Sequence, residues 1–221
     1  MHNIILIGTV HEECGLCNLD ELYKIIKSVN PEVIFEEITL SDFNDHYENK
    51  SNYKLETNTI IKYSETFPIK HIPVDIYKKI SPSLLGKHRH MHHQIEIRSN
   101  IYKDLIDKNT FYKRQFGFKY INSIDCMQNY VELYKEVEIV LKMINNDKFF
   151  QINNLWNNFM KKREDKMLDQ IYIYCKNNKF EKGIFFIGSA HRESIIYKIN
   201  KYKEINNVKI NWNYSNYENI L

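Results

Sequence analysis

Two copies of a short pattern, an apolar run followed by Gly-x-x-His, lie near opposite ends of the 221-residue chain. Residues 3–11 read NIILIGTVH and residues 183–191 read GIFFIGSAH, so the two histidines are His11 and His191. Imidazole nitrogens bind first-row metals and exchange protons near neutral pH. A converging pair therefore suits metal-assisted or general acid–base chemistry. The same ending on two strands favours one shared site over two unrelated strand ends.

Carboxylates end two further runs of apolar residues. Glu36 and Glu37 follow residues 33–35, and Asp75 follows the weaker run at 69–74. Strand side chains alternate between faces, so only one of Glu36 and Glu37 can share a crevice with the histidines. Two imidazoles and a carboxylate would hold Mn²⁺, Co²⁺ or Zn²⁺, or would transfer protons without a metal. The simpler alternative is that each group caps a strand or faces solvent.

Arg163 is a fifth candidate because it lies on the apolar stripe of a predicted helix. It is three residues after Met160 and four before Met167, which places all three on one helical face. An arginine there is paired with a carboxylate near the core or reaches an anionic group in the site. The alternative is that it snorkels to the surface.

The elements that must position these residues follow from periodicity. The two long apolar runs are typical of parallel strands buried on both faces, and each glycine suits a tight exit from its strand. A helix at Leu19–Val29, between the first run and the strand at 33–35, predicts a right-handed parallel crossover. Residues 41–66 are expected to be partly helical. The run at 69–75 predicts a strand at an edge or strand end, because Pro73 cannot donate to a ladder.

Residues 81–178 show no strand pattern and predict a helical insertion that covers the carboxyl edge of the sheet. Its helices are expected near Met91–Lys108, Met127–Asn145 and Gln151–Asn177. A further helix at Glu193–Tyr202 and a last strand at Val208–Trp212 complete the chain.

The predicted architecture is thus a single α/β domain over residues 1–221, with a mainly parallel central sheet and flanking helices. Its first and last long strands should be parallel neighbours, so that their glycines share one edge. His11 and His191 should then face one crevice together with Glu37, while Glu36 points away into the opposite face.

Composition excludes several classes of protein. With 43% hydrophobic and 27% charged residues the chain is globular, and a net charge of +3 spread along it gives no nucleic-acid footprint. Four cysteines without regular spacing make no disulfide framework. Neither a signal peptide nor a membrane-spanning run is evident, so we expect a cytoplasmic protein with a small-molecule or peptide substrate. The oligomeric state is left open.

The motifs GTVH at 8–11, PEVIFEE at 31–37, Arg163…Met167 and GSAH at 188–191 resemble the TraB/Tiki superfamily. This group, also called TraB/PrgY/GumN, is related to ChaN and erythromycin-esterase-like proteins, and its pattern is GTxH, PDxVxxE, Arg-x-x-x-Met and GxxH. The match makes Glu37 the family carboxylate, with Glu32 in place of the usual Asp. The resemblance implies an α/β fold with two GxxH loops at one site, and Tiki members are described as metal-dependent proteases.

From the residues and the resemblance together we expect a metal-dependent hydrolase of peptide, amide or ester bonds. His11, Glu37 and His191 would hold the metal or activate water, Asp75 would assist, and Arg163 would stabilise negative charge. The alternative is a non-catalytic ligand-binding or signalling module that keeps the same pocket.

Two weaker signals remain. Cys14-x-x-Cys17 follows His11 at a spacing that zinc sites use, but a lone pair of this kind is more often two ordinary thiols. The run from His88 to His93 holds four histidines and is interpreted as a solvated helix start. An adventitious metal or an acidic partner is the alternative there.

Overall fold

The computed structural model describes residues 1–49, 54–75, 77, 79–205 and 208–214. They form an α/β fold around one sheet of five parallel strands in the order β3-β2-β4-β1-β5, which confirms the predicted fold class. The strands are β1 (His2–Thr9), β2 (Val33–Glu36), β3 (Lys70–Pro73), β4 (Lys182–Gly188) and β5 (Ile210–Asn213). Pro73 lies on the edge strand β3, as expected for a residue without an N–H.

The central pair of strands, β1 and β4, joins the two ends of the chain. They run parallel in a register that places Gly8 opposite Ile187 and Thr9 opposite Gly188. The prediction that these strands are parallel neighbours is therefore confirmed. Their glycine-containing ends lie at the same edge of the sheet, which brings the two Gly-x-x-His loops together.

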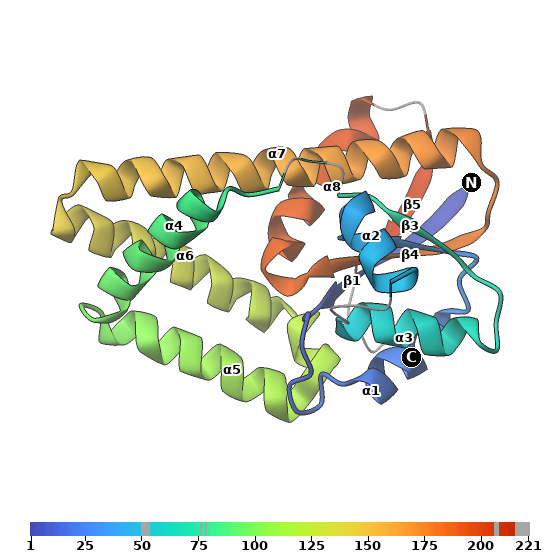
Figure 1. Cartoon of the computed structure of the whole chain (residues 1–221), viewed down its shortest axis with the longest axis horizontal. Helices are drawn as coiled ribbons and strands as arrows, with labels where there is room; N and C mark the ends of the chain where they lie inside the picture. The colour runs from blue at the N-terminus through green and yellow to red at the C-terminus, as the bar shows by residue number, and fades with distance from the viewer. Residues whose placement is uncertain (50–53, 76, 78, 206–207, 215–221) are drawn as a thin grey trace.

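Helices cover both faces of the sheet, with α1 (Leu19–Val29) and α3 (Leu55–Ser64) on one and α7 (Asp147–Asn177) and α8 (Arg192–Ile205) on the other (Figure 1). Alternate strand residues divide between the two cores: Ile7, Ile34 and Phe186 pack on the α1–α3 side. Their neighbours in sequence pack on the α7–α8 side. Continuous apolar runs were required because both faces are buried.

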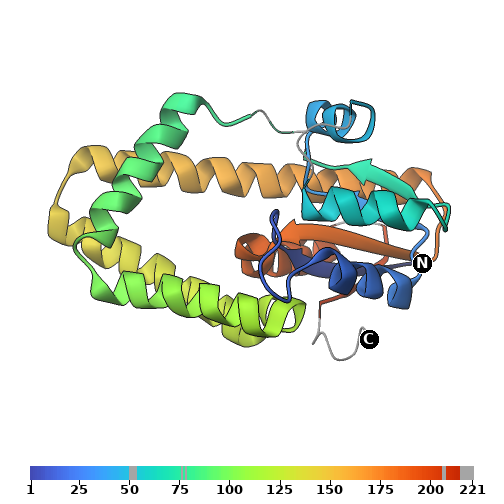
Figure 2. The same cartoon turned by 60° about the horizontal axis from the view of Figure 1, so that its bottom comes forward.

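The insertion at 81–178 is entirely described and contains no strand, as predicted, and it extends beyond the sheet (Figures 1 and 2). It comprises α4 (Pro82–Glu96), α5 (Asn100–Ile121), α6 (Ile124–Ile144) and α7. A separate small core holds it together, formed by residues such as Met91, Ile95, Leu133 and Val137. The N-terminal half of α7 belongs to this insertion and its C-terminal half to the sheet, so α7 connects the two.

The single helix predicted near Met91–Lys108 is wrong. The chain turns between α4 and α5, where Ser99 caps the new helix by accepting a hydrogen bond from the Tyr102 amide at 2.9 Å. Serine competes for backbone partners and so favours a cap over a helix interior. The helical pattern expected within 41–66 appears as α2 (Leu40–Tyr47) and α3, while residues 50–53 lie outside the described residues.

The end of α5 is attached to the sheet through Asn122. Its side chain accepts from the Gly8 amide at 2.7 Å and donates to the Gly8 carbonyl at 3.1 Å. These two bonds hold the insertion against the carboxyl end of β1. None of the helices in the described part of the chain has the length and apolarity needed to cross a membrane.

Candidate functional site

Gly188 lies at the centre of the predicted site. A methyl group built on its Cα would lie 3.4 Å from Glu37 Oε2, 3.7 Å from His191 Cδ2 and 4.0 Å from His11 Nε2. The structure therefore brings both histidines and Glu37 to one point, at the carboxyl end of β4. This is the edge at which open parallel sheets bind ligands.

His11 follows β1 and is half exposed, and its ring is oriented by a carboxylate. Its Nδ1 lies 3.1 Å from Glu56 Oε1, an oxygen that also accepts from the Thr9 hydroxyl at 2.7 Å. Glu56 is buried in the first turn of α3. This arrangement leaves Nε2 of His11 directed toward Gly188 and available to a ligand or a proton.

His191 ends the short 3₁₀ helix Ser189–His191 and is held in the same way. Its Nδ1 lies 2.6 Å from Glu164 Oε1, and the hydroxyl of Ser194 donates to the other oxygen of Glu164 at 2.6 Å. The second ring nitrogen, Nε2, lies 3.6 Å from Glu37 Oε1. Both histidines thus use Nδ1 for a buried carboxylate and present Nε2 to the crevice.

The two successive glutamates at the end of β2 bond different partners, although both line the small cavity beside His11. Glu37 accepts from the Gly188 amide at 2.6 Å and forms an ion pair with Arg163 at 2.6 Å. Glu36 instead accepts from the Tyr47 hydroxyl at 2.7 Å and pairs with His71 at 3.0 Å. Only Glu37 makes these bonds at Gly188.

Arg163 joins the strand-end carboxylates to α7. It donates to Asp75 at 2.7 Å as well as to Glu37, and its side chain is 19% exposed. The alternative that it snorkels to the surface is therefore wrong. Asp75 Oδ1 is buried without a hydrogen-bond partner among the described residues, so Asp75 depends on Arg163 for most of its compensation.

The site has a strongly anionic character. Burial disfavours the charged form of His191, but Glu37 and Glu164 outweigh burial and raise its pKa. Burial alone would raise the pKa of Glu37, yet the charges of His191 and Arg163 hold it below its ordinary value. For Asp75 burial prevails over Arg163, and its pKa is raised.

These shifts predict a fall in stability at alkaline pH. Because the pKa of His191 is raised, its contribution is complete below its ordinary value of 6.5 and is lost as the pH rises through the folded pKa. The lowered pKa of Glu164 gives a contribution that is complete above 4.5 and is lost in acid. Urea unfolding of metal-free protein at a series of pH values measures both losses of stability. His191→Gln should abolish the loss of stability above pH 6.5, whereas replacement of the exposed His90 by glutamine should leave it in place. The same loss in His191→Gln as in wild type would contradict the assignment to His191.

A small cavity of about 10 Å³ lies beside His11, Glu36, Glu37 and Glu56. This volume is about that needed by one water molecule. Oε2 of Glu56 is buried without a hydrogen-bond partner among the described residues, so a water in this cavity would supply the missing donor. The crevice therefore has room for a single water next to the imidazole and carboxylate groups that would activate it.

The donor set of the crevice fits a divalent transition metal in its chemistry. Ligating histidines characteristically bond a carboxylate through their other nitrogen, as both His11 and His191 do. Two donors on one ion lie roughly 3–3.5 Å apart, and His191 Nε2 and Glu37 Oε1 are 3.6 Å apart. In the described residues, however, no group of three or more His, Cys, Asp or Glu side chains is already assembled as a metal site.

Sequence reasoning missed Glu56 and Glu164, which orient the two rings. Glu164 lies four residues before Leu168 and three before Met167, on the same apolar stripe that singled out Arg163. A buried glutamate could have been inferred from that position. Glu56 gave no such signal, because it begins a helix in a polar stretch.

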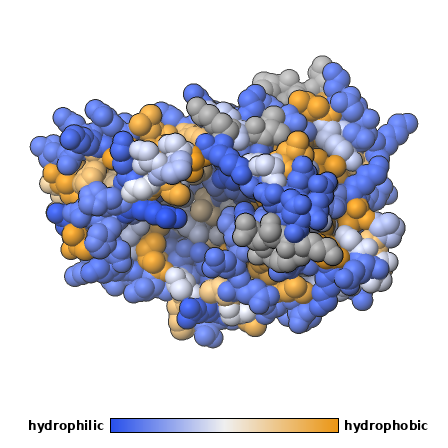
Figure 3. All heavy atoms as spheres, in the orientation of Figure 1, coloured by the Kyte–Doolittle hydropathy of each residue, from blue (hydrophilic) through white to orange (hydrophobic). Residues whose placement is uncertain are grey.

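A larger cleft of about 470 Å³ adjoins His191 and lies between α4, α6, α7 and α8, where the molecular surface is hollowed (Figure 3). Its walls include Trp156, Tyr134 and Met160, with Glu164 and His191 at the sheet end. A substrate in this cleft would reach the crevice at His191. Clefts that combine aromatic and apolar walls with polar groups are typical of small-molecule and peptide sites.

The two weaker sequence signals differ in where the structure places them. His88 and His92 line the cleft and are half-buried, so their interpretation as part of a solvated helix start is wrong. That interpretation holds only for the exposed His90 and His93. Cys17 is fully buried, and burial raises the pKa of its thiol to about 12. It is a core residue that packs with α1.

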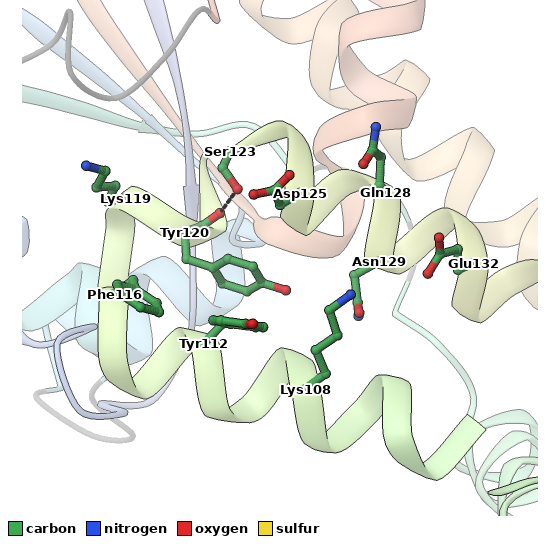
Figure 4. Close-up of a pocket in the computed structure, with 10 residues that line it drawn as sticks. All are labelled: Lys108, Tyr112, Phe116, Lys119, Tyr120, Ser123, Asp125, Gln128, Asn129 and Glu132. Carbon is green, nitrogen blue, oxygen red and sulfur yellow. Dashed lines mark hydrogen bonds between the residues drawn. The ribbon is translucent and has the colours of Figure 1, made fainter. Parts of the chain in front are cut away.

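A further cleft of about 470 Å³ lies between α5 and α6, where Tyr112 and Tyr120 stand near Lys108 and Asn129 (Figure 4). Its lining contains no histidine or cysteine, and its carboxylates Asp125 and Glu132 are exposed. It shares no residue with the crevice at Gly188. We therefore place the candidate active site at Gly188 and not here.

Comparison of the chain with protein-family models, curated protein sequences and solved structures gave no match. Functional conclusions consequently rest on the geometry of the site.

Proposed function

We propose that the crevice at Gly188 is the active site of a metal-dependent hydrolase that cleaves a peptide, amide or ester bond. One observation carries the proposal: two imidazoles, each fixed at Nδ1 by a buried carboxylate, meet Glu37 at a single point. Such an oriented set of ionisable groups is characteristic of catalytic centres.

His11, Glu37 and His191 would hold Mn²⁺, Co²⁺ or Zn²⁺, which when bound supplies an activated water and a Lewis acid. Glu56 keeps the proton of His11 on Nδ1, so that Nε2 faces the crevice as a base or ligand. Glu164 does the same for His191. The cavity beside His11 has room for a single water.

Arg163 and Asp75 support this centre from α7 and the end of β3. The guanidinium holds Glu37 in place and is itself held by Asp75. Its positive charge would stabilise negative charge that develops on the carbonyl of a substrate bound in the crevice. The cleft beside His191 would hold the rest of the substrate, a small molecule or a peptide.

A metal and activity assay tests the proposal. Protein without a histidine tag should contain Mn²⁺, Co²⁺ or Zn²⁺ or bind it when added, and should hydrolyse members of peptide and ester libraries. We expect His11→Ala and Glu37→Gln each to lower the rate at least about 100-fold, because each removes a group that activates water. His90→Ala, which removes an exposed histidine of α4, should leave both properties unchanged.

Absence of bound metal, together with unchanged function of His11→Ala, would refute the proposal of a metal-dependent hydrolase. Ligand binding without turnover, retained in Glu37→Gln, would instead support the alternative of a non-catalytic binding module.

A further inference from the structure

His88 and His92 form a second pair of imidazoles that the proposed hydrolysis does not use. They lie four residues apart on α4, so one helical face carries both. Their Nε2 atoms are 3.1 Å from each other, and the ring centroids are 4.3 Å apart. Two nitrogens at this distance compete for one proton or share one ion.

Both rings are fixed by neighbouring helices. Trp156 of α7 stacks on His88 with centroids 3.6 Å apart and planes 10° from parallel. The Tyr102 hydroxyl of α5 lies 2.8 Å from His92 Nδ1. The pair is thus preorganised, because neither ring can turn without losing one of these contacts.

The separation of the two Nε2 atoms matches that of donors on one transition metal ion. With metal–nitrogen bonds of about 2.0–2.1 Å, tetrahedral or square geometry places two donors about 2.9–3.4 Å apart. Burial lowers the pKa of His88 to about 4, with His92 adding to the effect, and burial lowers the pKa of His92 as well. Both rings are therefore neutral at pH 7, the form that binds metals.

We propose that His88 and His92 form a second transition-metal site, with two protein ligands and its remaining positions open to the cleft. Both rings line the cleft of about 470 Å³ that also reaches His191. Paired imidazoles select Cu²⁺, Ni²⁺ or Zn²⁺ over Mg²⁺ and Ca²⁺. Because no third His, Cys, Asp or Glu joins them in the described part of the chain, water or a ligand in the cleft would complete the coordination.

Trp156 provides a built-in reporter of this site. Bound Cu²⁺ quenches nearby indole fluorescence, and Trp156 is in contact with His88. The other tryptophan, Trp212, is buried at the far strand of the sheet against Phe185 and Tyr172. Quenching that disappears in Trp156→Phe therefore reports on this cleft.

The experiment is a titration of the full chain with Cu²⁺, followed by Trp156 fluorescence. Wild type, His11→Ala, His90→Ala and His93→Ala should all show quenching that saturates, and in His11→Ala, where the crevice at Gly188 has lost a ligand, saturation should fall near one equivalent. His92→Gln, which leaves the Trp156 stack in place, should weaken binding at least about tenfold, and Tyr102→Phe about 10–100-fold through loss of the supporting hydrogen bond.

Electron paramagnetic resonance of the Cu²⁺ complex adds a readout that does not depend on folding stability. Splitting from two imidazole nitrogens is expected in His11→Ala, whose crevice at Gly188 has lost a ligand, and from at most one in the double variant His11→Ala/His92→Gln. Quenching that does not saturate, or that His90→Ala reduces as much as His92→Gln, would overturn the site. Because His11→Ala lacks a ligand of the proposed hydrolase site but keeps His88 and His92, Cu²⁺ binding in this variant tests the second site whether or not the hydrolase proposal holds.

Discussion

Replacing Arg163 by alanine is expected to lower the free energy of unfolding by about 3–5 kcal/mol. The guanidinium lies between Glu37 and Asp75, and all three groups are largely or fully buried. Its removal leaves Asp75 without a counter-charge and Glu37 with His191 alone, and Asp75 already has one unpartnered oxygen among the described residues. Chemical unfolding at pH 7 measures the loss.

Two matched variants make this prediction specific. Lys162→Ala removes an exposed cation from the position of α7 just before Arg163 and should change the free energy of unfolding by no more than about 0.5 kcal/mol. Arg163→Lys keeps the charge but not the planar fork that reaches both carboxylates, so we expect an intermediate loss of stability and reduced activity.

The loss in Arg163→Ala should also shrink as the pH falls toward 4, because unpaired carboxylates are relieved by protonation. A loss below about 1 kcal/mol at pH 7 would show that Glu37 and Asp75 do not depend on this counter-charge.

Gly188→Ala is expected to abolish function without lowering stability. Gly188 has φ −53°, which alanine adopts freely, and the added methyl would make only ordinary contacts of 3.4–4.0 Å. Alanine at such a position stabilises by about 0.4–1 kcal/mol through the unfolded chain. The methyl nevertheless fills the point where His11, His191 and Glu37 meet, so hydrolysis should fall at least about 100-fold.

Gly8→Ala, at the first of the two motifs, is the matched control. A methyl there would lie 3.2 Å from the Ile121 carbonyl oxygen and 3.3 Å from Asn122 Oδ1, which are tight contacts with the end of α5. We expect this variant to lose about 1–3 kcal/mol of stability. Thermal unfolding and rate assays of both variants decide the matter. Normal activity in Gly188→Ala would remove the crevice from consideration as a catalytic site.

Glycine is thus required for a different physical reason in each of the two motifs, although the sequence context is the same. Gly8 admits a side-chain amide that fastens the helical insertion to β1. Gly188 keeps open a space among ionisable groups and donates its amide to Glu37. This difference has no counterpart in the local pattern, since Asn122 is far from Gly8 in the chain.

Much of the framework could be predicted from local sequence. Continuous apolar runs identified the buried parallel strands, and their shared ending predicted that β1 and β4 lie side by side with His11 and His191 at one edge. Alternation along β2 predicted that Glu37 and Glu36 face opposite ways; the two bond different partners, although both line the small cavity beside His11. The prediction for the strands succeeded because a strand buried on both faces must be apolar at successive positions.

The partners of the site residues depended on tertiary structure alone. Glu56 and Glu164 orient the two histidine rings from helices α3 and α7, and His88 and His92 turn inward because α5 and α7 supply Tyr102 and Trp156. Each of these contacts joins residues of different elements, which the loops and the packing of the helices bring together in space. Periodicity assigns a residue to a face of its own element, but only the packing of elements decides which group that face meets.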